Sequence, residues 1–457
     1  MLTYELKKSP GIPLYEALYR CIRGDILSGK LAAGEKLPSK RALSAHLEVS
    51  KITVEAAYNQ LAAEGYIAAR EKVGYFVEAV DTVAQPLRPA DPPVSSARAQ
   101  DPPLLDLTAN IPAKFPFTVW SRLQRETLLD FGHNLLEPVP HQGVAALRQA
   151  IAGHLAGFRG MQVDPENIVI GAGTDFLYNL LLQLLGQDKV YALEEPGYGK
   201  IRRIYNAAGA KSIPAPMDSQ GVIPEAIETA DVLHMSPSHH FPTGLITPLQ
   251  RRQALLRWAS EGKKWIIEDD YDSEFRFDAH PMSAMYSPAD SGRVIYMNSF
   301  SKSLAPSIRM GYMVLPHELM RQFREKLGFY SCTVSGFEQH TLARFLSQGH
   351  FEKHINRMRK FYRSRRNRVL ELLKNCRWAE KLTIEEADAG LHFLVKVDTD
   401  LPDQALEDLC AGMGLRVRCL SRYYFGTPPD ASLHKIVVNY SGLQDDDLAR
   451  LADILGK

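Results

Sequence analysis

A proline-rich segment divides this chain of 457 residues into two unequal parts. Residues 81–103 read DTVAQPLRPADPPVSSARAQDPP, with six prolines among 23 residues and hardly a large apolar side chain. Such a stretch lacks the apolar surface that folding needs, and it is typical of an extended linker that spans roughly 70 Å at about 3 Å per residue. We therefore expect a small module at 1–80, a linker at 81–103 and a large module at 104–457.

The composition is that of folded globular domains. Hydrophobic residues make up 45% of the chain and charged residues 23%, which is enough to bury sizeable cores. The net charge of +1 means that any nucleic-acid surface has to be a local patch. The five scattered cysteines form no CxxC pair, which argues against zinc and disulfides and favours reduced thiols. Without an apolar signal core in MLTYELKKSP or a run of about 18 apolar residues, we expect a soluble, cytoplasmic protein that does not enter a membrane.

The small module predicts three helices and a β-hairpin, an α+β arrangement. Apolar residues recur at a four-residue stride in 13–28, which is typical of a helix with one buried stripe. Ser39 is a good N-cap for a short helix, and after a tight turn Ser50 caps a longer one that ends at Gly65. The alternating stretch that follows predicts a hairpin with its bend near Gly74.

A helix-turn-helix with a wing places one helix in the major groove of DNA. Short hydroxyl and cationic side chains at the starts of the two helices suit contacts to phosphates and base edges. We assign DNA contact to Ser39, Arg41, Ser50, Lys51, Thr53 and Gly74. The stretch GEKLPSKRALSAHLEVSKITVEAAYNQLAAEGYI, followed by VGYFV, closely resembles the GntR family of winged-helix regulators.

Two observations qualify that DNA-binding prediction. Winged helices sometimes serve only as protein-interaction modules, so this alternative stays open. Residues 1–80 hold 11 basic and 9 acidic side chains, a net charge of about +2. Binding of double-stranded DNA by a single copy should therefore be weak, which favours a dimer.

Strands and helices alternate in the large module. Five short apolar runs end in polar or small residues: IVIGAG, VYALEEP, VLHMSPS, KWIIEDDY and RVIYMNSF. Helical stretches between most of them, such as 175–186 and 248–261, predict a parallel sheet covered by helices, with functional residues at the carboxyl ends of the strands. After Pro316 the pattern is mostly helical, and a smaller α+β portion with strands in LHFLVKV, LRVRCLS and KIVVNYS closes the chain.

Lys302 stands in the run MNSFSKSLAPSIRMGYMV, at the end of a predicted strand. Ser299 and Ser301 flank it, and Arg309 follows seven residues later. A lone lysine is ordinarily a surface residue. Serine hydroxyls with an arginine, however, make a binding set for a phosphate dianion. An amine held beside a phosphate site is what a Schiff base with pyridoxal phosphate requires, so we predict that cofactor on Lys302.

The strand WIIEDDYDSEF supplies further pieces of such a site. Asp269 and Tyr271 share one side of a strand by alternation, so the carboxylate can face a pyridine nitrogen and the phenol the ring oxygen. Asp270 and Asp272 then face away and are structural.

Two other strand ends add phosphate and ring contacts. In GAGTDF, Gly173 and Thr174 turn a strand into a helix whose N-terminus attracts phosphate, although such a turn alone is weak evidence. Tyr198, at another strand end, has an aromatic face that can stack on the pyridine ring.

These residues resemble the fold-type I aminotransferases over about 104–457, and the resemblance rests on their order along the chain: Gly173-Thr174, Tyr198, PTG at 242–244, Asp269-x-Tyr271, Ser-x-Ser-Lys302 and Arg309. Together with the winged helix and the linker, the chain resembles the MocR/GabR subfamily of GntR regulators. The resemblance implies a multidomain protein in which a winged helix-turn-helix is fused to an α/β PLP-dependent transferase fold. It also implies a head-to-tail homodimer, pyridoxal phosphate on Lys302, and a small effector that is an amine, an amino acid or the cofactor itself.

The chain departs from catalytic aminotransferases at three places. Where they carry an asparagine before the PTG proline, this chain has Phe241, so we expect His240, or else His239, to contact the cofactor. The glutamine common after Thr174 is Asp175, which would repel phosphate if it faced inward. The last strand, KIVVNYSGL, lacks the arginine that binds a substrate carboxylate. Candidate replacements in an effector pocket, each equally explained as a surface charge, are Lys200, Arg416, Arg418 and Arg422.

The basic run 350–377 has ten lysines and arginines against two acids, and it indicates either a solvated helix face or a second contact with DNA. For the whole chain, the leading hypothesis is a transcriptional regulator that senses its effector through a Lys302 aldimine. The alternative is an active aminotransferase with an appended DNA-binding domain. The missing last-strand arginine favours the regulator, because transamination needs repeated, oriented capture of carboxylate substrates.

Overall fold

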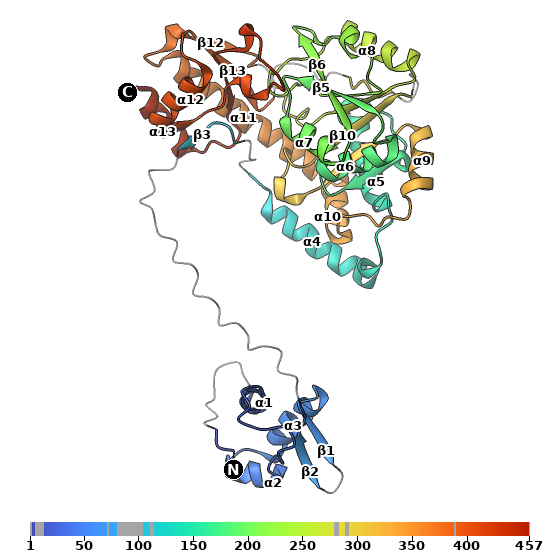
Figure 1. Cartoon of the computed structure of the whole chain (residues 1–457), viewed down its shortest axis with the longest axis vertical. Helices are drawn as coiled ribbons and strands as arrows, with labels where there is room; N and C mark the ends of the chain where they lie inside the picture. Colours follow the sequence, from blue (N-terminus) through green and yellow to red (C-terminus); the bar gives the residue numbers. More distant parts are fainter. Residues whose placement is uncertain are drawn as a thin grey trace. The chain divides into compact units, whose positions relative to one another are not determined.

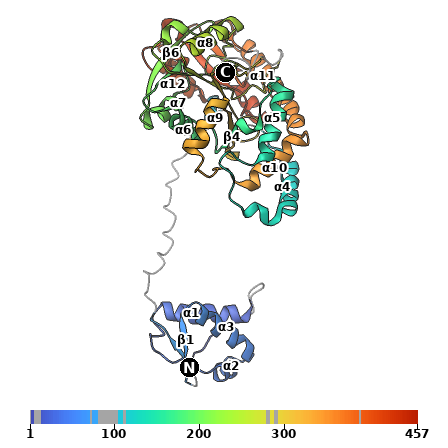
Figure 2. The ribbon, with the colours of Figure 1, turned by 90° about the vertical axis from the view of Figure 1, so that its right-hand side faces the viewer.

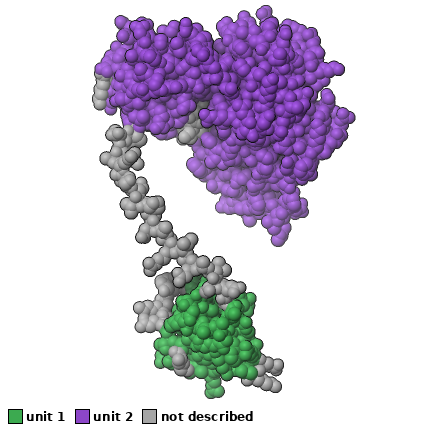
Figure 3. All heavy atoms as spheres, in the orientation of Figure 1, with its two compact units in different colours: residues 1–100 green, residues 101–457 purple. Residues whose placement is uncertain are grey.

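The computed structural model describes residues 2–4, 13–70, 73–79, 104–109, 114–277, 283–287, 292–387 and 390–456. The chain forms two compact units, Met1–Gln100 and Asp101–Lys457, which are coloured separately in Figure 3. The predicted linker at 81–103 lies outside the described residues, so the module boundaries stay predictions. No helix in the described ranges has the length and apolarity needed to cross a bilayer.

The small unit has the predicted three helices and hairpin, labelled in Figure 1. Their bounds are α1 Leu14–Leu27, α2 Lys40–His46, α3 Lys51–Ala63, β1 Ile67–Arg70 and β2 Gly74–Val77. Both predicted N-caps are confirmed: Ser39 Oγ accepts a hydrogen bond from the Ala42 amide at 3.1 Å, and Ser50 Oγ from the Thr53 amide at 3.1 Å. Each cap satisfies an amide that the helix itself leaves unpaired.

The hairpin is fixed against the helix pair by aromatic and charged contacts. The ring of Tyr58 in α3 packs edge-on against Tyr75 in β2, with centroids 5.0 Å apart. Lys40 Nζ pairs with Glu55 Oε1 at 2.7 Å and lies 5.3 Å from the centre of the Tyr75 ring. Residues from α1, α3 and both strands share one buried core below these contacts. The wing therefore has a defined position relative to α2 and α3.

The large unit is built on an eight-stranded sheet with the order β4-β11-β10-β9-β8-β5-β6-β7. The five predicted strands are confirmed and run in the same direction, with β6 added beside β5. The strand bounds are β4 Ile168–Gly171, β5 Val190–Glu195, β6 Lys211–Asp218, β7 Gly221–Val222, β8 Val232–Met235, β9 Trp265–Asp269, β10 Val294–Ser299 and β11 Gly311–Val314. One correction concerns β11, which was not predicted and runs antiparallel between β10 and β4.

Helices cover both faces of this sheet. One face packs against α6 Thr174–Leu185, α7 Gly199–Ala207 and α9 His317–Leu327. The other packs against α5 Ala145–Arg159, α8 Leu249–Glu261, α10 Gly336–Ser347 and α11 His350–Lys374. Successive strand side chains point to opposite faces, so Ile266 joins one core and Ile267 the other. Figure 2 shows α4, Phe117–Phe131, lying beside α10, which in turn packs against α5.

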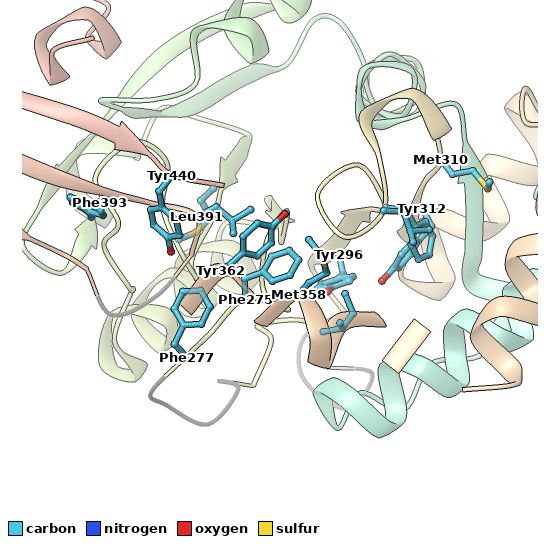
Figure 4. Packing of buried hydrophobic residues seen from close by; sticks show 14 of the residues in the cluster. Phe275, Phe277, Tyr296, Met310, Tyr312, Met358, Tyr362, Leu391, Phe393 and Tyr440 are labelled. Atoms are coloured by element: carbon cyan, nitrogen blue, oxygen red, sulfur yellow. The ribbon is translucent and has the colours of Figure 1, made fainter. Parts of the chain in front are cut away.

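A smaller α+β portion closes the chain. The antiparallel sheet β12-β13-β15 consists of Leu382–Glu385, His392–Val397 and Lys435–Asn439, and the helices are α12 Asp403–Gly412 and α13 Asp445–Gly456. Of the predicted strand LRVRCLS only β14, Leu415–Arg416, is regular, and it pairs with β3, Leu105–Asp106. The core continues from the large sheet into this portion, because one buried cluster contains Phe275 and Tyr362 as well as Leu391, Phe393 and Tyr440 of the closing portion (Figure 4).

The basic run 350–377 lies mostly on α11, and several of its charges have partners within the unit. Arg365 pairs with Asp445 at 2.5 Å, and Arg359 Nε donates to the Glu274 carbonyl at 2.6 Å. Arg366 Nη1 donates to the Ala387 carbonyl at 3.0 Å. These contacts give part of the basic run a structural role, and contact of the remainder with DNA stays a prediction.

Candidate functional site

A cavity of about 420 Å³ opens where β5, β8, β9 and β10 end and where α6 begins. This is the edge at which parallel α/β sheets ordinarily bind ligands. Of the predicted residues, the cavity is lined by Thr174, Tyr198, Lys200, Asp269, Tyr271, Ser299, Ser301, Lys302 and Arg309. These residues span about 135 positions of the chain, from Thr174 to Arg309, and the sheet brings them together at one edge.

Asp269 is the last residue of β9 and is buried at the floor of the cavity. Its Oδ2 accepts a hydrogen bond from the Tyr178 hydroxyl at 2.5 Å and lies 3.5 Å from His234 Nε2. Its Oδ1 is buried without a hydrogen-bond partner among the described residues. Because a buried polar atom is costly when unpaired, this carboxylate is suited to accept a proton-bearing group of a ligand.

Of the neighbouring acids, Asp270 faces the other way, as predicted. Asp270 Oδ2 lies 3.0 Å from Arg159 Nη2 and accepts a hydrogen bond from the Tyr296 hydroxyl at 2.6 Å. Asp272 Oδ2 lies 2.9 Å from His239 Nδ1. Neither carboxylate lines the cavity: Asp270 anchors the strand end from behind, whereas Asp272 lies close enough to Tyr271 and Lys302 to influence the pKa of each.

Tyr271 follows β9 and presents its hydroxyl to the cavity, 3.2 Å from His239 Nδ1. Burial and the nearby Asp272 carboxylate raise the pKa of Tyr271 well above its ordinary value. The phenol therefore stays protonated and acts as a hydrogen-bond donor at neutral pH.

Lys302 lies just after β10, and its neighbours in the sequence are Ser301 and Ser303. Burial lowers the pKa of Lys302 to about 8, and the Asp272 carboxylate opposes part of this shift. A fraction of the amine is thus neutral near pH 7, which is the form that attacks a carbonyl.

Gly173 and Arg309 form a tight contact at the N-terminus of α6. Gly173 has φ +83°, and a Cβ on it would lie 2.7 Å from Arg309 Nη2. Arg309 Nη2 lies 3.3 Å from the Ala172 carbonyl and 3.3 Å from Asp175 Oδ2. Lys200 Nζ pairs with the same Asp175 oxygen at 2.7 Å. The helix end and these cations make this corner favourable for an anion.

His240 lies outside the cavity, contrary to the prediction. Its Nδ1 is 2.7 Å from Thr243 Oγ1 and its Nε2 is 3.5 Å from Glu194 Oε2. Burial lowers the pKa of His240 to about 3, so the ring is neutral. From this loop Ser236 and Phe241 line the cavity, and Phe241 packs edge-on against Tyr198, with ring centroids 5.9 Å apart.

Of the effector-pocket candidates, only Lys200 lines the cavity. Arg422 lies instead against Glu407, with Nη2 3.2 Å from Oε2, because α12 presents that carboxylate. Arg416 pairs with Asp106 at 3.3 Å. Arg418 is exposed and does not line the cavity. These three arginines are corrected to positions outside the cavity.

Several lining residues escaped the sequence analysis. Tyr178 had a signal, since it stands four residues after Thr174 on one helix and hence on the same face. Glu194 and His234 are the next-to-last residues of β5 and β8, which pair directly with each other, and burial raises the pKa of Glu194 to about 8. Thr108 and Asn439 come from the two ends of the large unit, where no local pattern points to a site.

In the small unit the predicted DNA-contact residues gather at the starts of α2 and α3. Arg41 and Lys51 are exposed in the first turns of these helices. Ser39 and Ser50 are exposed caps, and Thr53 is half-buried beside Ser50, with their hydroxyl oxygens 2.8 Å apart. Gly74, at φ +132°, begins the second strand of the wing.

Comparison with known proteins agrees with both units. Residues 14–77 match the family model described as bacterial regulatory proteins, gntR family. The large unit resembles a kynurenine aminotransferase of Pyrococcus horikoshii solved with PMP, with a TM-score of 0.67 and 24% identity over 77% of this chain and 90% of that one. At this identity the likeness shows the fold alone.

Relatives that span both units are regulators. The HTH-type transcriptional regulator YdeL of Bacillus subtilis is 35% identical over 98% of this chain and 97% of its own length. The pyridoxine biosynthesis regulator PdxR of Corynebacterium glutamicum is 33% identical over 95% and 93%. The probable rhizopine catabolism regulator MocR of Rhizobium meliloti is 32% identical over 96% and 92%. The chain is a transcriptional regulator with a DNA-binding winged helix, and it belongs to the MocR/GabR-like subfamily of the GntR family.

Proposed function

We propose that this regulator binds pyridoxal phosphate through Lys302 and uses the loaded pocket to sense an amine, an amino acid or the cofactor itself. The observation that carries the proposal is the gathering of Lys302, Asp269, Tyr271 and Arg309 around one cavity, in a chain that also holds a DNA-binding unit. The aminotransferase fold of the large unit supports it.

The residues present fit the cofactor. The unpartnered Asp269 Oδ1 is suited to a protonated pyridine nitrogen. The lowered pKa of Lys302, about 8, is suited to covalent attachment of an aldehyde. The glycine at 173 leaves room for the Arg309 guanidinium at a helix N-terminus, which is suited to a phosphate. When bound, the cofactor supplies an aldehyde that reacts reversibly with primary amines.

Each side chain then has a distinct task. Lys302 would attach the cofactor through its amine. Tyr271 donates a hydrogen bond into the cavity and is held by His239. Thr174, Ser299, Ser301 and Arg309 hold the phosphate, and Tyr198 covers the ring from its half-exposed position.

An active aminotransferase is the rival function. Among the described lining residues Arg309 is the single arginine, and we assign it to phosphate. No second arginine in that set remains to orient a substrate carboxylate, and oriented capture is what repeated turnover requires. This favours a sensor over an enzyme.

Regulation requires that the two units be coupled. An effector at Lys302 alters DNA affinity only if it binds one arrangement of the winged helices better than another. We propose a head-to-tail homodimer on double-stranded operator DNA, because the net charge of about +2 at 1–80, from 11 basic and 9 acidic residues, makes a single copy a weak binder.

The test begins with the visible spectrum of the purified protein. Cofactor-replete protein should absorb near ~420 nm, and borohydride reduction followed by peptide mapping should place the adduct on Lys302. An adduct elsewhere, or no chromophore, refutes the cofactor assignment.

The second arm measures operator affinity, with the operator selected from random DNA by the full chain. Apo, holo and amine-treated protein should differ by about 5–150-fold, the usual range of allosteric coupling. Lys302→Ala should abolish the covalent part of that difference and leave basal DNA binding. Equal affinity in all states, together with turnover of about 1 s⁻¹ or faster, would establish the aminotransferase instead.

A further inference from the structure

Asp175 places a carboxylate in the corner of the cavity that the proposed function gives to phosphate. It is the second residue of α6, lines the cavity, and lies 3.3 Å from Arg309 Nη2. From the sequence, we expected Asp175 to repel phosphate if its side chain faced inward, and Asp175 does line the cavity. The one lining arginine therefore already contacts an anion that belongs to the protein.

Lys200 contacts the same oxygen of Asp175. Its Nζ lies 2.7 Å from Asp175 Oδ2, which is closer than the 3.3 Å between that oxygen and Arg309 Nη2. Lys200 belongs to the first turn of α7, so the carboxylate bridges the starts of two helices. About a third of the Asp175 side chain and half of the Lys200 side chain are exposed, so both can change rotamer without repacking a core.

This corner holds two cations that attract phosphate, Arg309 and Lys200, and one carboxylate that repels it, Asp175. A phosphate dianion at Arg309 would lie beside Asp175, and like charges a few ångströms apart repel even in a partly solvated site. Lys200 neutralises Asp175 and can hold it away from Arg309 when phosphate enters. Without Lys200, Arg309 is the remaining cation in contact with the carboxylate among the described residues, and the carboxylate competes with phosphate for it.

We propose that Asp175 is a built-in competitor for the phosphate site at Arg309, and that Lys200 restrains it. Asp175 lowers the affinity for pyridoxal phosphate enough that occupancy follows the concentration of the free cofactor, and Lys200 limits that loss of affinity. This inference rests on the proposed function and deepens it, because an exchangeable cofactor is one that the regulator can itself sense. A permanently loaded enzyme has no need of such a competitor.

The experiment compares the binding of pyridoxal phosphate, pyridoxal and inorganic phosphate to full-length apo variants. Asp175→Asn should bind pyridoxal phosphate about tenfold more tightly than the native chain and release it more slowly, because the repulsion is gone. Pyridoxal, which lacks the phosphate, should bind both proteins alike. Inorganic phosphate should compete better in the variant.

Lys200→Met separates restraint from direct phosphate binding. It should weaken cofactor binding about tenfold in the native background and have little effect when combined with Asp175→Asn. An equal loss in both backgrounds means that Lys200 binds phosphate itself and overturns its proposed role. Asp218→Asn, which removes one negative charge at the Arg251 pair outside the cavity, is the matched control and should leave binding unchanged.

Two results distinguish failure of this inference from failure of the proposed function. If the native chain and Asp175→Asn form the chromophore with equal affinity, the competitor is refuted while cofactor binding stands. If none of the proteins forms a chromophore, the proposed function fails and this inference fails with it.

Discussion

Gly173 gives the sharpest test of how the phosphate corner is built. Its backbone, at φ +83° and ψ 173°, is a conformation that essentially only glycine adopts. A Cβ there would lie 2.7 Å from Arg309 Nη2 and 2.9 Å from Cζ. Gly173→Ala therefore strains the backbone and pushes the guanidinium out of its place.

Both costs can be estimated. The backbone strain is of order 1–3 kcal/mol, which should lower the midpoint of thermal unfolding of the large unit. Loss of a charge-assisted hydrogen bond to the phosphate is worth about 1.5–3 kcal/mol, or roughly 10–150-fold in the dissociation constant of pyridoxal phosphate. Binding of unphosphorylated pyridoxal should change much less.

Gly209→Ala is the matched control. Gly209 has a similar φ of +80°, but a Cβ on it would meet nothing within 4 Å. It should share the loss of stability, at about 1–2 kcal/mol, and keep the cofactor affinity of the native chain. Equal cofactor affinity in the native chain and Gly173→Ala would refute the assignment of this corner to phosphate.

Three further outcomes test other parts of the molecule. Burial lowers the pKa of Lys302 to about 8, and the neutral amine is the reactive form. The rate at which apo protein takes up pyridoxal phosphate should therefore rise with pH and level off above about pH 8. A flat profile of this rate between pH 6 and 9 contradicts the prediction. Arg41→Ala and Lys51→Ala should each weaken operator binding, by about 1–3 kcal/mol where the side chain reads a base, with an unaltered cofactor spectrum; full affinity in both variants would exclude this docking of α2 and α3. Arg159→Met leaves the buried Asp270 without its cationic partner and should cost about 3–5 kcal/mol in urea unfolding, of which Asp270→Asn in the same chain should restore a part.

The sequence predicted those parts of the site that depend on local spacing. Alternation along β9 separates Asp269 from Asp270, and the structure has one in the cavity and the other against Arg159. Lys302 and Arg309 were predicted correctly because they are only seven residues apart and serines flank the lysine, so one short segment contains the amine, the hydroxyls and the guanidinium. The sheet was predicted because its strands are buried on both faces and read as continuous apolar runs.

The errors arose where partners far along the chain decide a position. Arg422 is held by Glu407 of α12 and Arg416 by Asp106 of β3, and no spacing in the sequence links these pairs. The strand β11 was missed because GYMV is short and enters antiparallel in an otherwise parallel region. Asn439 reaches the cavity only because the C-terminal portion packs against the large sheet.

The last strand bears most directly on sensor against enzyme. Val437, in the middle of β15, is buried in an apolar cluster with Leu394 and Leu420, and Phe241 packs against it. A substrate carboxylate in such surroundings would lose its hydration without gaining a cationic partner, which costs several kcal/mol. A catalytic cycle meets this cost at every turnover, whereas a sensor needs only one reversible binding event to shift an equilibrium. An apolar last strand, a protein carboxylate at the phosphate corner and a DNA-binding unit on the same chain are therefore consistent with a single requirement, namely reversible occupancy of the pocket.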